Sequence, residues 1–189
     1  YKGASFADLT GGAGVDAFFL SRSFARGVYA EADAERCDLA RHNFGVLGAQ
    51  HLQVVQSTAE AFLATNKDSF DLIYIDPDRR AAHKRAVGFS DSTPDVVQLM
   101  PELLKRANTV LIKASPMIDI RQGIRDLGAV RKVTVLAVNN ECKEVLFECG
   151  AAAQPLQIEA VHLLQGKEHQ FVFDPEEEAT AEVTLAHVQ

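Results

Sequence analysis

Hydrophobic residues along this chain fall into short strand-like runs that alternate with segments of helical character. The strand-like runs are Ala4–Leu9, Gly27–Ala32, His51–Gln56, Phe70–Ile75 and Thr109–Ala114. The segments that favour helices are Val15–Phe24, Asp33–Gly48, Ser57–Thr65, Thr93–Ala107 and Asp119–Leu127. Strands that alternate with helices predict an α/β fold, in which helices cover both faces of a mostly parallel sheet.

The last two strands of this sheet are expected to run antiparallel to each other. The β-rich segments Val133–Val138 and Glu144–Cys149 lie close together in the sequence. Parallel neighbours need a crossover of about a dozen residues or more, and no helical segment separates these two. They therefore predict a hairpin that closes the sheet.

A small β-rich extension follows the hairpin. The stretch Gly150-Ala-Ala-Ala-Gln-Pro155 marks a boundary, and two strand-like runs come after it, Ile158–Leu164 and His169–Phe173. We expect one domain over residues 1–150, and an extension over residues 151–189 that begins a further module.

A glycine-rich loop follows the first predicted strand. Gly11, Gly12 and Gly14 let the backbone turn tightly and approach a ligand closely, because no Cβ is in the way. With Ala17 in third place, the loop also satisfies the dinucleotide fingerprint, which keeps a nicotinamide oxidoreductase open as an alternative. Asp8 disfavours that alternative, because a carboxylate at the strand tip would repel a pyrophosphate. It suits an ammonium group, such as that of S-adenosylmethionine.

Polar residues also stand at the carboxyl ends of the later strands. They are Glu31, Ser57-Thr58-Ala59 and Asp76-Pro77. Glu31 lies about twenty residues beyond the loop, where a carboxylate can accept from both ribose hydroxyls. Ser57 is expected to open a capping box at the start of the following helix. Ligands of such sheets bind at the carboxyl ends of the strands, so these residues predict one shared site.

Taken in order, the motifs resemble the class I S-adenosylmethionine-dependent methyltransferases, above all those that act on RNA. The resemblance rests on Asp8, Gly11-Gly-x-Gly14, Glu31 and Asp76-Pro-x-Arg79, and it covers residues 4–150. More narrowly, Asp76-Pro-Asp-Arg-Arg80 and Lys113-Ala-Ser-Pro-Met-Ile-Asp119 resemble bacterial methyltransferases that carry a THUMP-like domain. The resemblance implies a Rossmann-like fold with a seven-stranded sheet whose last strand is antiparallel. It also implies S-adenosyl-L-methionine as the cofactor.

The resemblance further implies roles for individual residues. The implied cofactor-binding residues are Asp8, Thr10, Gly11, Gly12, Gly14, Glu31, Asp33, Thr58, Ala59, Asp76 and Pro77. We expect Asp76 to be catalytic together with Arg79, because a carboxylate fixed beside the rigid Pro77 can orient a nucleophile and take its proton. Asp78 replaces the second proline of enzymes that methylate base amines, and no aromatic residue follows it, which disfavours a simple base amine as the acceptor. Asp16 is expected to favour the start of its helix through the helix dipole, and a binding role for it stays open as the alternative.

A basic cluster follows the Asp76 motif, although the chain as a whole carries a net charge of −7. That net charge disfavours general nucleic-acid binding, whereas a local cluster beside the methyl donor can hold phosphates. The expected substrate residues for RNA are Arg79, Arg80, Lys84, Arg85 and Lys113. Three alternatives stay open: a solvated loop, a small-molecule methyltransferase, and a non-catalytic module for RNA binding or assembly.

Composition adds several exclusions. The six histidines have no ligand spacing, which predicts no metal site, and no apolar run is long enough for a membrane span. Three cysteines without a Cys-x-x-Cys pair predict a reduced, cytoplasmic protein, and only Cys142 is a candidate for nucleophilic methylation of a pyrimidine carbon. The first strand follows Tyr1 almost at once, where methyltransferases usually have a helix, so we expect further domains of a longer chain.

Overall fold

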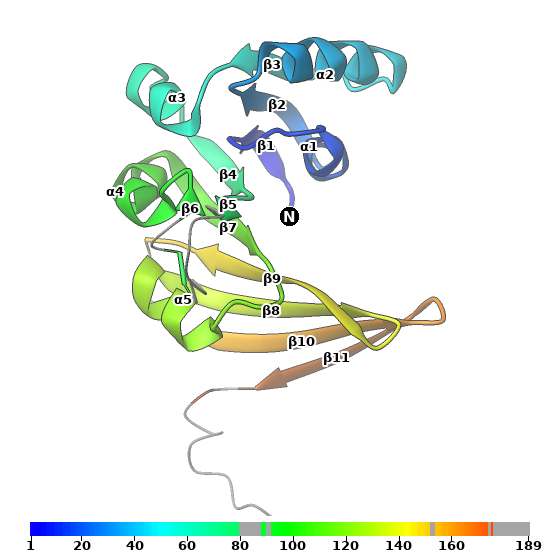
Figure 1. Cartoon of the computed structure of the whole chain (residues 1–189), viewed down its shortest axis with the longest axis vertical. Helices are drawn as coiled ribbons and strands as arrows, with labels where there is room; N and C mark the ends of the chain where they lie inside the picture. The colour runs from blue at the N-terminus through cyan, green and yellow to red at the C-terminus, as the bar shows by residue number, and fades with distance from the viewer. Residues whose placement is uncertain (80–87, 90–91, 152–153, 174, 176–189) are drawn as a thin grey trace, which may run out of the picture.

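The structure, a computed structural model, describes residues 1–79, 88–89, 92–151, 154–173 and 175. Its centre is a nine-stranded sheet in the order β11-β10-β8-β9-β7-β4-β1-β2-β3 (Figure 1). Its strands are β1 (Gly3–Asp8), β2 (Phe24–Glu31), β3 (Leu52–Gln56), β4 (Phe70–Ile75), β7 (Ala107–Ala114), β8 (Val130–Val138), β9 (Glu141–Cys149), β10 (Gln157–Leu164) and β11 (Lys167–Phe173). A separate short ladder joins β5 (Asp78–Arg79) to β6 (Ser92–Thr93). The helices are α1 (Val15–Ser21), α2 (Ala34–Val46), α3 (Ala59–Thr65), α4 (Val96–Arg106) and α5 (Ile120–Leu127).

The parallel part of the sheet confirms the alternation of strands and helices. Strands β3, β2, β1, β4 and β7 run parallel to one another. Strands β8 and β9 form the predicted antiparallel hairpin, and β9 pairs antiparallel with β7. The carboxyl ends of β1, β2, β3, β4 and β7 therefore lie along one edge of the sheet.

Two hydrophobic clusters cover the two faces of the sheet. Successive strand residues point to opposite faces, so neighbours in sequence belong to different clusters. Leu72 and Leu111 pack with residues of α1 and α2, whereas Ile73 and Ile112 pack with residues of α3, α4 and α5. The central strands are thus buried on both faces, as expected for parallel strands between helical layers.

The expected count of seven strands was wrong, because the extension adds two strands to the same sheet. Strand β10 pairs in parallel with β8 from Gln157↔Lys132 to Leu163↔Val138, and β11 pairs antiparallel with β10. Strand β8 would otherwise leave its outer row of backbone groups unpaired, and the partly buried Ile158 packs against the core. The predicted division between residues 1–150 and 151–189 stays a prediction, although β10 and β11 continue the first domain's sheet.

Helix starts follow the capping rules with two shifts from the expected positions. Asp33, Asp95 and Asp119 each accept from the backbone N–H three residues on, and they begin α2, α4 and α5. Helix α4 therefore starts after Asp95, not at Thr93. At α3 the cap is Thr58, not Ser57, because Thr58 Oγ1 accepts from the N–H of Ala61 at 3.2 Å.

Helix α1 ends earlier than the hydrophobic pattern predicts. Phe24 already belongs to β2, where it pairs with Gly3 of β1. Its ring stacks on Phe6 with 5.5 Å between ring centroids. Pairing with β1 and this ring contact outweigh continuation of the helix.

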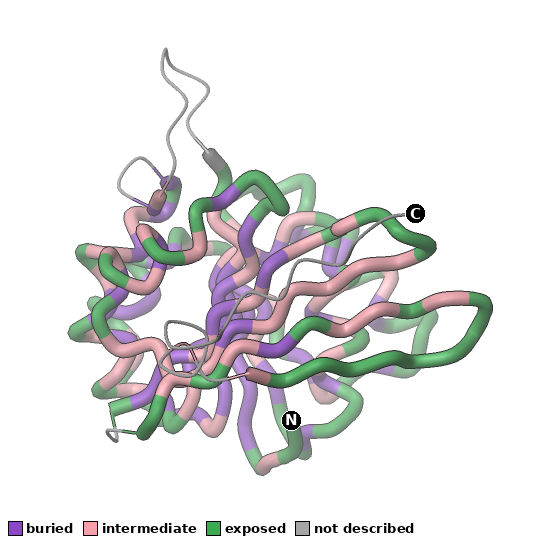
Figure 2. Tube along the Cα trace, turned by 90° about the horizontal axis from the view of Figure 1, so that it is seen from below, coloured by how far each residue is buried: buried purple, intermediate pink, exposed green. Residues whose placement is uncertain are grey.

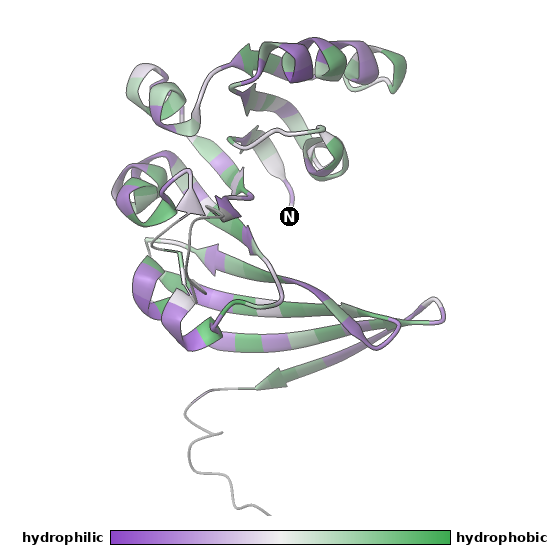
Figure 3. Cartoon of the chain, viewed as in Figure 1, coloured by the Kyte–Doolittle hydropathy of each residue, from purple (hydrophilic) through white to green (hydrophobic). Residues whose placement is uncertain are grey.

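Burial decreases toward the strands of the extension. In Figure 2 the buried positions gather at the centre of the sheet, and most residues of the edge strand β11 are exposed. Figure 3 shows hydrophobic and hydrophilic residues alternating along β10, which is typical of a strand with two unlike faces. Within the part of the chain that the structure describes, no helix is both long enough and apolar enough to cross a membrane.

Candidate functional site

The glycine loop between β1 and α1 forms one wall of the site. Gly12 and Gly14 have φ angles of 53° and 79°, a region that favours glycine. A Cβ at Gly11 would lie 2.3 Å from the Tyr29 ring, so only glycine fits beneath the loop. The Tyr29 hydroxyl donates to the carbonyl of Gly12 at 2.6 Å, which fixes the turn from below.

Glu31, at the end of β2, holds this loop and faces the same space. One carboxylate oxygen accepts from the N–H of Gly12 at 2.8 Å, and the other accepts from the N–H of Asp33 at 2.9 Å. Each carboxylate oxygen has a further lone pair, so Glu31 can still accept from two hydroxyl groups of a ligand. Its place between the loop and α2 suits the predicted ribose contact.

A cavity of about 640 Å³ opens where these elements meet. Its volume is in the range of small-molecule and cofactor sites. Predicted residues that line it are Thr10, Gly12, Glu31, Thr58, Ala59 and Asp76. Ser57, which the sequence placed at the same strand end as a helix cap, lines it too, and the lining residues that the sequence did not assign to the site are Leu9, Ala13, Ala30, Ala32, Arg36, Leu39, Glu60, Asp78, Thr93 and Pro94. Most of these are ordinary strand, helix or loop positions, and no motif distinguishes them.

The other predicted cofactor residues lie behind or beside this wall. Asp8, Gly11, Gly14 and Asp33 are not among the lining residues, and Pro77 lines a neighbouring cavity. Gly11 and Gly14 shape the loop, and Asp33 caps α2. Their predicted contacts with the cofactor stay predictions.

Asp8 is buried and connects the glycine loop to the end of β4. Its Oδ1 accepts from Thr10 N–H at 2.9 Å and from the Thr10 hydroxyl at 3.3 Å. The same hydroxyl oxygen accepts from the N–H of Asp76 at 2.7 Å. Burial, helped by the nearby carboxylates of Asp16 and Asp76, raises the pKa of Asp8 to about 7 against the opposing bonds from Thr10. A cation bound close to Asp8 would favour its ionised form.

Lys113, from the end of β7, joins two carboxylates at the same edge. Its ammonium lies 2.7 Å from Asp16 Oδ2 and 2.7 Å from Asp76 Oδ2, and the Tyr74 hydroxyl donates to Asp16 at 2.7 Å. These two bonds hold the pKa of Asp16 below its ordinary value although burial opposes them. Burial raises the pKa of Asp76, which Lys113 lowers only in part. Lys113 was predicted to bind the substrate. In the structure the two carboxylates that it contacts belong to the protein, and its contact with RNA stays a prediction.

A second cavity, of about 360 Å³, shares Asp76 and Asp78 with the first one. It lies beyond the ends of β4 and β7. Its other lining residues are Pro77, Gly88, Phe89, Lys113, Ala114, Ser115, Ile118, Lys143 and Glu144. Two adjoining cavities that share the carboxylates of Asp76 and Asp78 offer room for two ligands that meet there.

The structure describes only part of the basic cluster. Arg80, Lys84 and Arg85 lie outside the described residues. The backbone of Arg79 pairs with Ser92 in the β5–β6 ladder. Their predicted contacts with RNA, and a catalytic role for Arg79, stay predictions.

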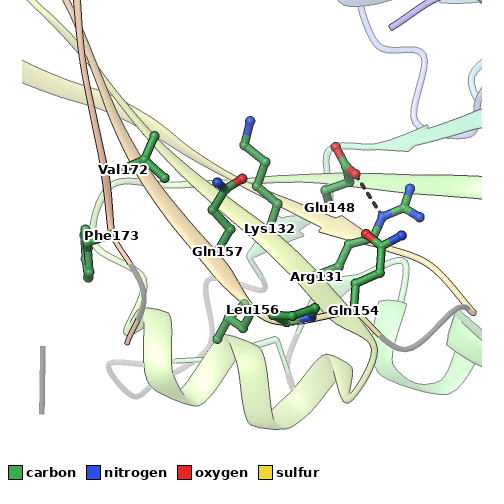
Figure 4. Close-up of a pocket in the computed structure, with 9 residues that line it drawn as sticks. Arg131, Lys132, Glu148, Gln154, Leu156, Gln157, Val172 and Phe173 are labelled. Carbon is green, nitrogen blue, oxygen red and sulfur yellow. Dashed lines mark hydrogen bonds and ion pairs between the residues drawn. The ribbon is translucent and has the colours of Figure 1, made fainter. Parts of the chain in front are cut away.

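A further cavity, of about 530 Å³, lies at the opposite edge of the sheet (Figure 4). It is found at the start of β8 and β10, and no predicted site residue lines it. Arg131 pairs with Glu148 at 2.8 Å, as Figure 4 shows, and Lys132 pairs with Glu159 at 2.5 Å. Both cations of this cavity are thus neutralised within the protein, so we place the function at the Asp76 edge.

Metal ligation and cysteine chemistry gain no support in the described part of the chain. No group of three or more His, Cys, Asp or Glu side chains there is arranged to hold a metal ion. Cys142 lines none of the three cavities.

Two known proteins resemble this chain over most of its length, and a third resembles about a third of it. A solved structure of a candidate methyltransferase from Porphyromonas gingivalis W83 superimposes with a TM-score of 0.86 and 31% identity, covering 99% of this chain and 48% of that one. An uncharacterized S-adenosylmethionine-dependent methyltransferase of Mycobacterium tuberculosis is 25% identical over 162 residues, or 85% of this chain and 43% of that protein. The ribosomal RNA large subunit methyltransferase K/L of Pseudomonas putida is 39% identical over 70 residues, or 36% of this chain and 10% of that protein.

The chain spans less than half the length of each of these proteins. Its fold is shared with the candidate methyltransferase of known structure, and the Asp76 edge holds a cavity whose volume is in the range of small-molecule and cofactor sites. The model of the family described as conserved hypothetical protein 95 matches residues 1–135. The chain belongs to the conserved hypothetical protein 95 family.

Proposed function

We propose that this protein transfers a methyl group from S-adenosylmethionine to RNA, and that Asp76 is the point where cofactor and acceptor meet. One observation carries the proposal. Asp76 lines both a cavity of about 640 Å³ beside the glycine loop and a cavity of about 360 Å³ beyond β7. A transfer reaction needs the donor and the acceptor in neighbouring sites with their reacting atoms close together.

The larger cavity fits the cofactor in its chemistry as well as in its size. Glu31 supplies a carboxylate for the ribose hydroxyls, and Leu39, Ala59 and Pro94 supply apolar walls for a flat ring. Asp8, behind the glycine loop, supplies a negative charge that favours a cationic ligand. When bound, S-adenosylmethionine supplies an electrophilic methyl group, and this chain's residues have only to bind and orient the two partners.

Asp76 orients the methyl acceptor and takes its proton. Its carboxylate is fixed by Lys113, while its backbone N–H is fixed by Thr10. A carboxylate held in this way can accept a hydrogen bond from an N–H or O–H of the acceptor and take the proton that methylation releases.

The RNA part of the proposal has two supports. The Pseudomonas putida relative is named a ribosomal RNA methyltransferase, and the sequence motifs resemble RNA-acting enzymes with a THUMP-like domain. The basic residues that follow Asp76-Pro77 supply positive charge for phosphates.

Labelled methyl transfer tests the proposal. The full-length protein is incubated with S-adenosylmethionine labelled in its methyl group and with total RNA from a strain that lacks the gene. We expect label in the RNA fraction, and none when Asp76 is replaced by Ala. Cofactor binding without label in any RNA would favour a small-molecule methyltransferase instead.

A further inference from the structure

The acceptor cavity has an acidic side chain that no predicted role uses. Glu144 lies near the start of β9, next to Val145, which pairs with Ala114 at the end of β7. It lines the smaller cavity together with Asp76. Among the described residues it makes no hydrogen bond and no ion pair within 4.0 Å, although Lys113 is near enough to lower its pKa against the effect of burial.

The lysines of this cavity are already engaged. Lys113 contacts Asp16 and Asp76, both at 2.7 Å, and Lys143 contacts Glu141 at 2.5 Å. Among the described residues, Asp76 is compensated by Lys113, whereas Asp78 and Glu144 make no ion pair within 4.0 Å and leave the cavity acidic. An anionic group such as a phosphate is repelled there, whereas a group that donates N–H bonds finds several acceptors.

The remaining walls suit a flat ring. Phe89 and Ile118 also line the cavity, and the Phe89 ring is held edge-on against Phe147 with 5.3 Å between centroids. No aromatic residue follows Asp76-Pro77 directly in the sequence, so Phe89 is the aromatic side chain that the described structure brings to this cavity.

We infer that Glu144 is a specificity residue that accepts an N–H of the methyl acceptor, and that the acceptor is a neutral nitrogen heterocycle of the nucleobase class. The inference rests on the proposed function and narrows it. The base enters the acidic cavity between Asp76 and Glu144, and its phosphates stay outside. Acceptors without N–H donors on the ring leave the Glu144 carboxylate unpaired, so they bind less well.

The first test compares Glu144→Gln with Glu168→Gln, which changes the same charge on the exposed edge strand β11 outside the cavity. With total RNA as substrate, Glu144→Gln is expected to lower kcat/KM by about ten- to a hundredfold through loss of a charge-assisted hydrogen bond. Glu168→Gln is expected to match the wild type, and S-adenosylhomocysteine affinity is expected to be equal in all three. Equal kcat/KM for Glu144→Gln and the wild type would overturn the inference.

The methylated atom gives a second test on the wild-type protein alone. Digestion of the labelled RNA and mass spectrometry of its nucleosides are expected to place the methyl group on a base nitrogen. A methyl group on a ribose oxygen or a base carbon would overturn the inference while leaving RNA methylation itself intact.

A third test separates the cavity's chemistry from the RNA proposal. Fluorescence titration with 2-aminopurine, in saturating S-adenosylhomocysteine so that the cofactor cavity is filled, is expected to show binding that is about tenfold weaker in Glu144→Gln. Such a result supports the inference even if no RNA is methylated, in which case only the proposed substrate fails. Equal binding of 2-aminopurine by the variant and the wild type would count against Glu144 in either case.

Discussion

The Lys113 ammonium lies 2.7 Å from the carboxylate of Asp76, a residue that lines both cavities. The same ammonium contacts Asp16 at 2.7 Å, so one cation compensates two acids. Both acids are part of the site's framework: Asp16 opens α1 behind the glycine loop, and Asp76 ends β4. Lys113 is therefore a positioning residue in this account.

Replacing Lys113 by Met tests this role. The change leaves two neighbouring carboxylates without their cation, which raises the pKa of Asp76 further. We expect kcat to fall about ten- to a hundredfold at neutral pH, because less Asp76 is ionised and free to take a proton. The acid limb of the pH–rate profile should move to higher pH.

Lys105→Met serves as the control, because Lys105 is exposed on α4 and pairs with Glu102. Stability of Lys113→Met is expected to fall by about 1–3 kcal/mol, since the lysine is partly exposed and the loss is smaller than for a buried pair. A pH profile that keeps its acid limb in place would show that Lys113 does not act on Asp76.

Glu31→Ala is expected to weaken S-adenosylhomocysteine binding by about 1.5–3 kcal/mol, because it removes a charged acceptor for the ribose. Calorimetry measures the change. Glu31 also accepts from the N–H groups of Gly12 and Asp33, so part of the loss comes from the loosened loop.

Glu35→Ala is the matched control for Glu31→Ala, because it removes an acid from the first turn of α2. Thermal melting of the cofactor-free proteins separates the structural part of the loss from the binding part. Unchanged affinity in Glu31→Ala would mean that the ribose lies elsewhere.

Local sequence rules predicted much of the framework of this site. The strand ends, the glycine loop and the cap at Asp33 follow from patterns within a few residues, so the sequence displays them directly. The same rules could not distinguish Thr58 from Ser57 as the cap of α3, because either hydroxyl satisfies them.

Long-range contacts could not be predicted in the same way. Asp16 and Lys113 are 97 residues apart, and nothing in either local pattern indicates the other. The same holds for the pairing of β10 with β8, because β9 lies between these two strands in the sequence. The sheet therefore has nine strands where seven were expected. Such pairings depend on the assembled fold.

Asp8→Asn is expected to remove a pH dependence of stability. The pKa of Asp8 is raised by burial to about 7, well above that of an exposed carboxyl. The folded state then holds a proton that the unfolded chain has released, so stability is present at low pH and is lost as pH rises from about 4 to about 7.

Denaturant unfolding of the cofactor-free protein at pH 5 and pH 8 measures this loss. The wild type is expected to lose a few kcal/mol more than Asp8→Asn, of the order that linkage gives for a shift of this size. Asp38→Asn, on the exposed surface of α2, is expected to behave like the wild type. Parallel losses in wild type and Asp8→Asn would rule out a raised pKa at Asp8.

Changing Arg79, Arg80, Lys84 and Arg85 together to Gln tests the basic cluster. If these residues hold phosphates, RNA binds more weakly and the slope of log K against log salt shrinks by about 0.7 for each lost single-strand contact. S-adenosylhomocysteine affinity should barely change. Single variants are needed as well, since Arg79 lies close enough to Asp76 in sequence to brace the cavity wall.

A matched fourfold control changes Arg22, Arg26, Arg121 and Lys167, which are exposed elsewhere, to Gln. It removes the same charge and is expected to alter the salt slope much less. If RNA binding and its salt slope are the same in the cluster variant and in the wild type, the cluster is a solvated surface. A small-molecule methyltransferase would then be the favoured alternative.

The measurement that tests the central claim most directly is calorimetric titration of the wild-type protein with S-adenosylhomocysteine and, separately, with NAD. The glycine loop admits both classes in principle, and Asp8 behind the loop and Glu31 in the cavity wall distinguish them. We predict saturable one-to-one binding of S-adenosylhomocysteine and no measurable heat with NAD. Binding of NAD without binding of S-adenosylhomocysteine would contradict the account at its base.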